Sequence, residues 1–248
     1  MTTNNFKIDA FKLMSGAPIY VPDLQLYIHQ PRLYQIAEMG EENFFSFLSY
    51  FKINKSLIEK NIKDPMQSAI ISNMNEYELI LLLIEEQPEI EAGMSVILKL
   101  IIKDLKTIRF NPGFLFLNTE SGHQYIINNE SFLVIKDIIY QIFSLENSGD
   151  EYNPLDGAAE KIADKLRERK RKLQESQGKK DQSILSDFVS ILVVGLHCLN
   201  LNNILNLTVY QIFNIMKRFG MYSQYNIQVQ ALMQGAEDVE LVDWLQTL

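Results

Sequence analysis

The sequence has very little cysteine, which limits both its covalent structure and its expected compartment. Cys198 is the single cysteine, so no disulfide can form within the chain. The first twelve residues, MTTNNFKIDAFK, contain no continuous apolar stretch of the kind that a signal peptide needs. We therefore expect a protein of a reducing, cytosolic environment.

Long apolar runs are also lacking. The longest mostly apolar stretch, residues 184–199, is interrupted by Asp187 and His197. It is shorter than the run of about 20 apolar residues with which a helix crosses a bilayer. The sequence therefore predicts no transmembrane helix and no membrane partner.

Recognisable catalytic and cofactor-binding motifs are missing. The histidines, His29, His123 and His197, are too far apart for a metal site defined by spacing. The glycines that fall in predicted turns stand alone and form no phosphate-binding loop. Cys198 lies in an apolar run, which disfavours a reactive thiolate. We expect no catalytic, cofactor-binding or metal-binding residue and no cofactor, and hence a protein that is not an enzyme.

Basic residues are concentrated in one stretch of an otherwise acidic chain. The net charge is −8, but residues 161–180, here called the basic segment, hold nine Lys or Arg and three acidic residues, which leaves −14 elsewhere. The segment is open to three interpretations: a solvated connecting helix, which we favour, a site for an acidic partner, or a nucleic-acid site. It has no aromatic residue to stack on bases, so we do not expect nucleic acid. Its candidate partner-binding residues are Lys165, Arg169 and Lys172.

Two regions of the N-terminal half predict β-structure. Residues 17–29 alternate apolar and polar side chains around a Pro22-Asp23 turn, which predicts a hairpin. Residues 107–128 contain three short strand-like runs separated by turn residues, which predicts a three-stranded meander. Whether the hairpin joins the same sheet is left open. Asn129 is the predicted N-cap of the helix that follows.

Several helices are predicted around these strands. An aromatic-rich helix begins near Glu41, with Phe44, Phe47, Leu48 and Phe51 on one core-facing stripe. Phe45 and Tyr50 fall off this stripe and are candidate partner-binding residues. Asn75 and Glu78 have the spacing of a capping box, which predicts a helix start.

The C-terminal part reads as helical throughout. We expect a helix from residue 184, a second one capped by Thr208 and running to residue 219, and a third one over residues 224–234. The predicted class is α+β, predominantly α. The predicted division is an α+β domain at residues 1–146, a linker and basic connecting helix at 147–180, and a helical domain at 181–248.

Three stretches of sequence share a pattern with known proteins. Residues 18–51 combine an extended start, a Gln-Pro turn, an Ile-x-Glu-x-Gly helix and an aromatic-rich helix, at Gln30, Pro31, Ile36, Glu38, Gly40, Phe44 and Phe47. Residues 74–85 and the closing residues 208–245 belong to the same pattern. The chain thereby resembles a group of phage proteins from hosts with low-GC genomes, which look like the tail assembly chaperones encoded beside the tape-measure gene of long-tailed phages.

This resemblance implies a role in virion assembly in the host cytoplasm. The protein would coat the long apolar helices of the tape-measure protein, keep them soluble and help to recruit tail-tube protein. The implied partners are therefore other phage proteins, and a homo-oligomer is left open. The resemblance carries over no site residue. A structural component of the virion and a nucleic-acid-binding protein stay open as alternatives.

Overall fold

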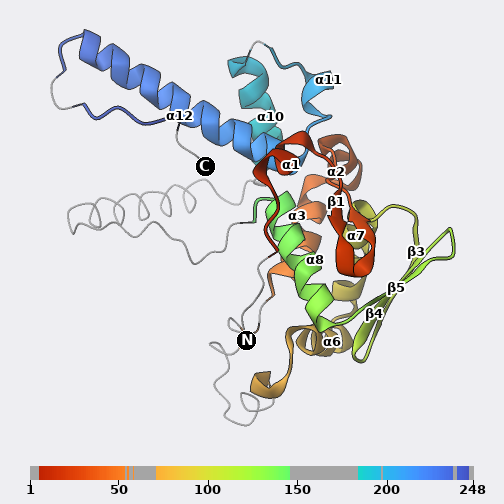
Figure 1. Ribbon diagram of the computed structural model, residues 1–248. Helices are drawn as coiled ribbons and strands as arrows, with labels where there is room; N and C mark the ends of the chain where they lie inside the picture. Colours follow the sequence, from red (N-terminus) through yellow and green to blue (C-terminus); the bar gives the residue numbers. More distant parts are fainter. Residues whose placement is uncertain are drawn as a thin grey trace.

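The computed structural model describes residues 6–53, 55, 58, 71–145, 184–196, 198–236 and 239–245 (Figure 1). Within these ranges the protein is mostly helical and carries two small antiparallel sheets. The predicted class, α+β and predominantly α, is confirmed. The basic segment and the linker before it lie outside the described residues.

The N-terminal hairpin forms where the period-two pattern predicts it. After a short helix, α1 (Ala10–Ser15), the strands β1 (Ile19–Val21) and β2 (Leu26–Ile28) pair through a 3-10 turn, η1 (Pro22–Leu24). The inward side chains of both strands are buried, whereas Tyr20 and Tyr27 lie on the outer face with ring centroids 4.9 Å apart. The hairpin is a sheet of its own and does not join the meander.

The aromatic-rich helix is the third helix of the chain. It follows α2 (Leu33–Met39), which ends at Gly40 with a φ of 90°, a value that favours glycine. The helix itself is α3 (Glu41–Ser49), continued by a 3-10 turn, η2 (Tyr50–Lys52). Its predicted core stripe is confirmed, with Phe44, Leu48 and Phe51 buried and Phe47 half-buried.

A capping box begins the next described long helix, as predicted. The Asn75 side chain accepts from the Glu78 N–H, and the Glu78 carboxylate accepts from the Asn75 N–H, which starts α6 (Glu76–Glu86). Pro88 then occupies the first turn of α7 (Pro88–Ile101), where its missing N–H costs nothing.

The predicted meander is confirmed, and it leads into a helix whose cap differs from the prediction. Its strands are β3 (Leu105–Asn111), β4 (Phe114–Thr119) and β5 (Gln124–Ile127), and α8 (Asn129–Ile142) contacts β5. The N-cap is Asn128, not Asn129, because the Asn128 side chain accepts from the Ser131 N–H at 2.9 Å. The Asn129 side chain accepts instead from the N–H of Tyr77 at 3.2 Å, at the start of α6.

The described C-terminal helices are α10 (Ile184–Gly195), the single turn α11 (Leu201–Ile204) and α12 (Val209–Met233). Thr208 caps α12 in a capping box with Gln211, as predicted. The predicted break between residues 219 and 224 is wrong, because α12 is one helix of 25 residues. A glycine inside a helix costs only about 1 kcal/mol, so Gly220 does not end it.

The C-terminal helices pack against the N-terminal half. The Leu33 N–H donates to the Leu207 carbonyl at 2.9 Å, and the Tyr34 N–H donates to the Leu205 carbonyl at 3.1 Å. Buried side chains of α10, α11 and α12 belong to the same hydrophobic cluster as those of the hairpin, the first helices and α8. The described parts of residues 1–146 and 181–248 are therefore in contact, and the division into two domains stays a prediction.

Candidate partner-binding groove

An open groove of about 640 Å³ lies where the two parts of the chain meet. Its walls come from α1, the C-terminal end of α8, the middle of α10 and the first half of α12. The lining is largely apolar and aromatic, with four polar side chains among its residues: Leu13, Tyr140, Gln141, Ser144, Leu145, Phe188, Tyr210, Phe213, Asn214, Met216 and Lys217. We call this the helical groove.

Aromatic rings form much of the groove surface. Phe188 on α10 and Phe213 on α12 meet edge to face, with ring centroids 5.3 Å apart and planes at 74°. Edge-to-face pairs are a preferred aromatic geometry and hold both rings in place. Tyr140 on α8 also lines the groove. Burial raises the pKa of its hydroxyl, and the charges of Glu76 and Asp137 raise this pKa further. Tyr140 is therefore a neutral hydroxyl at physiological pH.

Two glutamine side chains hold the walls of the groove together. The Gln141 side chain accepts from the Ile8 N–H at 2.9 Å and donates to the Phe6 carbonyl, which ties the segment before α1 to α8. The Gln211 side chain donates to the Met14 carbonyl at 2.6 Å, which ties α12 to α1. These contacts join residues far apart in sequence, so the groove depends on the tertiary fold.

A carboxylate from the N-terminal half caps α10. Glu41, the first residue of α3, accepts from the Leu185 N–H at 2.6 Å and from the Ser186 N–H at 3.3 Å. These N–H groups belong to the first turn of α10, where a negative charge is stabilising. Glu41 thereby fixes the helix that carries Phe188 into the groove.

The sequence-predicted partner-binding residues lie elsewhere. Phe45 is half-buried and packs with Phe44, at a ring distance of 5.2 Å. Tyr50 is also half-buried, and its ring fills the space beside Gly93 on α7. Both aromatic side chains take part in packing within the chain, and their role in binding a partner stays a prediction. Lys165, Arg169 and Lys172 lie outside the described residues.

Sequence reasoning did not find the groove. Most of its residues belong to apolar stripes of separate helices, which look like ordinary core positions. Leu13, Tyr140 and Phe188 come from three elements distant in sequence. The breadth of these apolar stripes was the one sequence feature related to the groove, and it does not predict which side chains remain exposed after folding.

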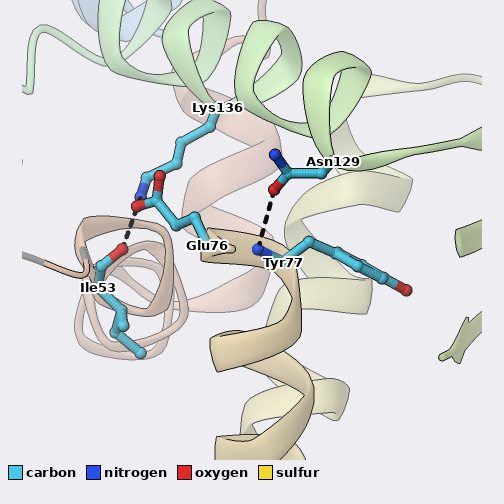
Figure 2. Close-up of polar contacts among 5 residues, drawn as sticks. All are labelled: Ile53, Glu76, Tyr77, Asn129 and Lys136. Carbon is cyan, nitrogen blue, oxygen red and sulfur yellow. Dashed lines mark hydrogen bonds and ion pairs between the residues drawn. The ribbon is translucent and has the colours of Figure 1, made fainter. Parts of the chain in front are cut away.

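A second group of polar side chains joins α6 to α8 (Figure 2). Lys136 is buried, donates to the Ile53 carbonyl at 2.6 Å and forms an ion pair with Glu76. Burial raises the pKa of the neighbouring Asp137 carboxyl, partly offset by a backbone hydrogen bond from Phe6 and the Lys136 charge. Each of these charges has partners inside the fold, so we interpret the group as a structural tie between helices.

Residues that could carry metal or nucleophilic chemistry are spread out in the described part of the chain. No group of three or more His, Cys, Asp or Glu side chains there has the geometry to hold a metal ion. His29 lies at the end of β2, His123 contacts Ser121 in the β4–β5 turn, and Cys198 is exposed after α10. Burial and the nearby Lys103 charge lower the pKa of His29. Among the described helices, none combines the length and apolar character that a membrane crossing requires.

Together these features describe a mainly helical protein with an open apolar groove between its two parts. Residues 177–248 match the family described as the YomV second domain, a family associated with phages and prophages. The match includes α10, α11 and α12, and so one side of the groove. No curated protein and no solved structure matches the chain. The similarity to this domain indicates a phage-related protein, in agreement with the setting that the sequence predicted.

Proposed function

We propose that this protein is a non-enzymatic phage assembly protein, a tail assembly chaperone that binds apolar helices of the tape-measure protein and aids assembly of the tail tube. The observation that carries the proposal is the helical groove. It leaves Leu145, Phe188 and Phe213 partly exposed at a junction of four helices. Apolar side chains of an amphipathic helix are the natural occupants of such a surface.

The size and rim of the groove fit this kind of ligand. A volume of about 640 Å³ accommodates a few large apolar side chains but not a whole helix, so a bound helix would insert one face. Asn214 and Lys217 in the lining can bond to polar groups beside that face. The net charge of −8 favours solubility of a complex with an apolar partner.

The test is co-expression with the tape-measure protein of the same phage genome. The wild type is expected to co-purify with it, and Leu145→Glu is expected to reduce the recovered complex at least tenfold, because the new carboxylate would lose its water when an apolar side chain enters. Ile126→Glu is the matched control, since it adds the same charge to an exposed position on β5. Equal recovery with both variants would reject the groove as the binding site.

The protein content of purified virions distinguishes a chaperone from a structural component of the virion. A chaperone is expected to be missing from purified virions. A stoichiometric amount of this protein in virions would overturn the chaperone role and support a structural component instead.

Nucleic-acid binding is the second candidate, and only the +6 charge of the basic segment favours it. It would appear as salt-dependent retention on DNA that is lost when Lys165, Arg169 and Lys172 are all changed to Glu. No such retention by the wild type would reject this candidate.

A further inference from the structure

Helix α12 extends well beyond the body of the protein (Figure 1). Its buried residues are Val209, Gln211 and Ile212, all in the first turns. From Phe219 to Met233 no residue of the helix is fully buried. At about 1.5 Å per residue, this second half projects roughly 20 Å, and we call it the arm.

The C-terminal residues cover one face of the arm. The Trp244 ring contacts Tyr222 and Tyr225, at centroid distances of 5.1 and 6.4 Å. Arg218 donates to the Trp244 carbonyl at 2.7 Å, and the Val242 N–H donates to the Gln228 side chain at 2.8 Å. Residues 239–245 therefore run back along the helix toward its root.

Another face of the arm has no described residue packed over it. The helix positions that enter the core at Val209 and Ile212 recur at spacings of three and four along the arm, a pattern that keeps them on one face. In the arm they are Gly220, Ser223, Ile227 and Gln230, and Gln234, the C-cap of the helix, continues the series. Ile227 is 67% exposed, and an added Cβ at Gly220 would meet no atom within 4 Å. The face of α12 that is buried at Val209 and Ile212 is therefore exposed at Ile227.

The arm also lacks charge. No charged residue occurs from Phe219 to Met233, whereas 22% of the whole chain is charged. At an ordinary frequency of about one charged residue in four, a solvated helix of this length would carry three or four. An uncharged helix with an exposed apolar residue at the centre of one face is typical of a helix that packs against another.

We propose that this face of the arm is the dimer interface of the protein, with the arms of two copies packed antiparallel about a two-fold axis near Ile227. In this arrangement Gly220 of one copy lies opposite Gln234 of the other, and the two Ile227 side chains meet at the axis. Small residues such as Gly220 and Ser223 allow two helices to approach closely.

The charges at the two ends of the arm select the antiparallel arrangement. The root carries Lys217 and Arg218 against one acidic residue, Asp243, which follows the chain back to Arg218, and so keeps a net positive charge. Glu240 is exposed near the tip, where the free carbonyls of the helix end are also negative. Antiparallel packing brings the positive root of each copy to the negative tip of the other. Parallel packing would instead place the two Lys217 side chains together and the two Glu240 side chains together. Because the charges at the two ends of the arm are complementary, a second copy of this chain is the partner that fits the exposed face of the arm.

The first test is the mass of the full chain in solution, by sedimentation equilibrium. The wild type is expected to be a dimer. Ile227→Glu is expected to weaken dimerisation at least tenfold, because a two-fold interface places both new carboxylates together. Met233→Glu is the matched control, since it adds the same charge to a residue of the same helix that is 82% exposed and off the stripe. Circular dichroism checks that each variant is folded.

The second test determines the orientation of the arms. In a Cys198→Ser background, Ile227→Cys is expected to form a covalent dimer with a short bismaleimide. Gln234→Cys is on the same face but is expected to form no covalent dimer, because its two copies would lie about 21 Å apart along the axis. Cross-linking at both positions would overturn the antiparallel arrangement. A monomeric wild type at the highest soluble concentration, or a dimer that Ile227→Glu leaves intact, would overturn the interface itself.

Discussion

Lys136 is a charged residue whose effect on stability depends on two partners from distant parts of the chain. Its ammonium group is buried, with the Ile53 carbonyl and the Glu76 carboxylate as partners. A buried charge is tolerated when it is both paired and hydrogen-bonded. The tie holds the N-terminus of α6 against α8, next to the contact between Asn129 and Tyr77.

Lys136→Met is therefore expected to lower the free energy of unfolding by about 3 kcal/mol, because Glu76 keeps a carboxylate that is only 19% exposed and loses its counter-charge. Urea unfolding measures this difference. Lys99→Met, at an exposed position of α7, is the control and should change stability by no more than about 0.5 kcal/mol. If the double variant Lys136→Met/Glu76→Gln is not more stable than Lys136→Met alone, the ion pair is not the cause.

Tyr77 should make stability depend on alkaline pH. Its side chain is buried and donates to the Asn111 carbonyl at 3.0 Å, and burial raises its pKa from 10.0 to about 12. The unfolded chain loses the phenol proton near pH 10 and the folded chain only near pH 12. The stabilisation is thus complete below pH 10 and is lost as the pH rises to 12.

The comparison of wild type with Tyr77→Phe isolates this effect. At pH 8 the variant is expected to be about 1 kcal/mol less stable, because the Asn111 carbonyl loses its hydrogen bond. Between pH 10 and 12 the stability of the wild type should fall by up to about 2 kcal/mol relative to the variant. Tyr20→Phe, an exposed tyrosine, should show no such relative change. A constant difference from pH 8 to 12 would contradict the raised pKa.

At the scale of secondary-structure elements, the caps decide where the helices begin. Asn75, Asn128 and Thr208 each accept a backbone N–H from the first turn of their helix. Two of these caps were predicted in place, and the third was predicted one residue too late. The two asparagines at 128 and 129 are equivalent in sequence, and only the neighbouring N–H of Tyr77 distinguishes them.

Thr208 is the cap with the largest expected consequence, because α12 carries part of the groove and the whole arm. Its hydroxyl accepts from the Gln211 N–H at 3.2 Å. The free energy of unfolding of Thr208→Ala is expected to be about 1 kcal/mol lower than that of Thr208→Ser. The serine variant keeps the hydroxyl and, like the alanine variant, lacks the methyl group. Thermal or urea unfolding of the two variants gives the difference. Equal stabilities would show that the cap does not contribute.

At the scale of the whole molecule, α12 connects the two proposed binding surfaces. Its first half lines the groove, and its second half forms the arm. The variants chosen for the two proposals lie apart, with Leu145 three residues after α8 and Ile227 on the arm. Leu145→Glu is expected to leave the dimer intact, and Ile227→Glu is expected to leave binding of the tape-measure protein intact. Failure of one proposal can therefore be told from failure of the other.

The sequence by itself determined the local structure. Period-two alternation located the hairpin, strand-like runs between turn residues located the meander, and the stripe through Phe44, Leu48 and Phe51 located the core face of α3. These features depend on neighbours within a few residues, so a single sequence contains the needed information. The break predicted between residues 219 and 224 was wrong, because the small cost of Gly220 inside a helix does not end it.

Only the tertiary structure decided which apolar residues are left uncovered. Phe188 and Phe213 look like core residues along their own helices, yet they line an open groove. Ile227 belongs to the same helix stripe as the buried Ile212, yet it is exposed because the body ends before it. Exposure depends on how elements distant in sequence pack together, and helix periodicity does not contain that information. The candidate sites of this protein are therefore properties of the assembled fold.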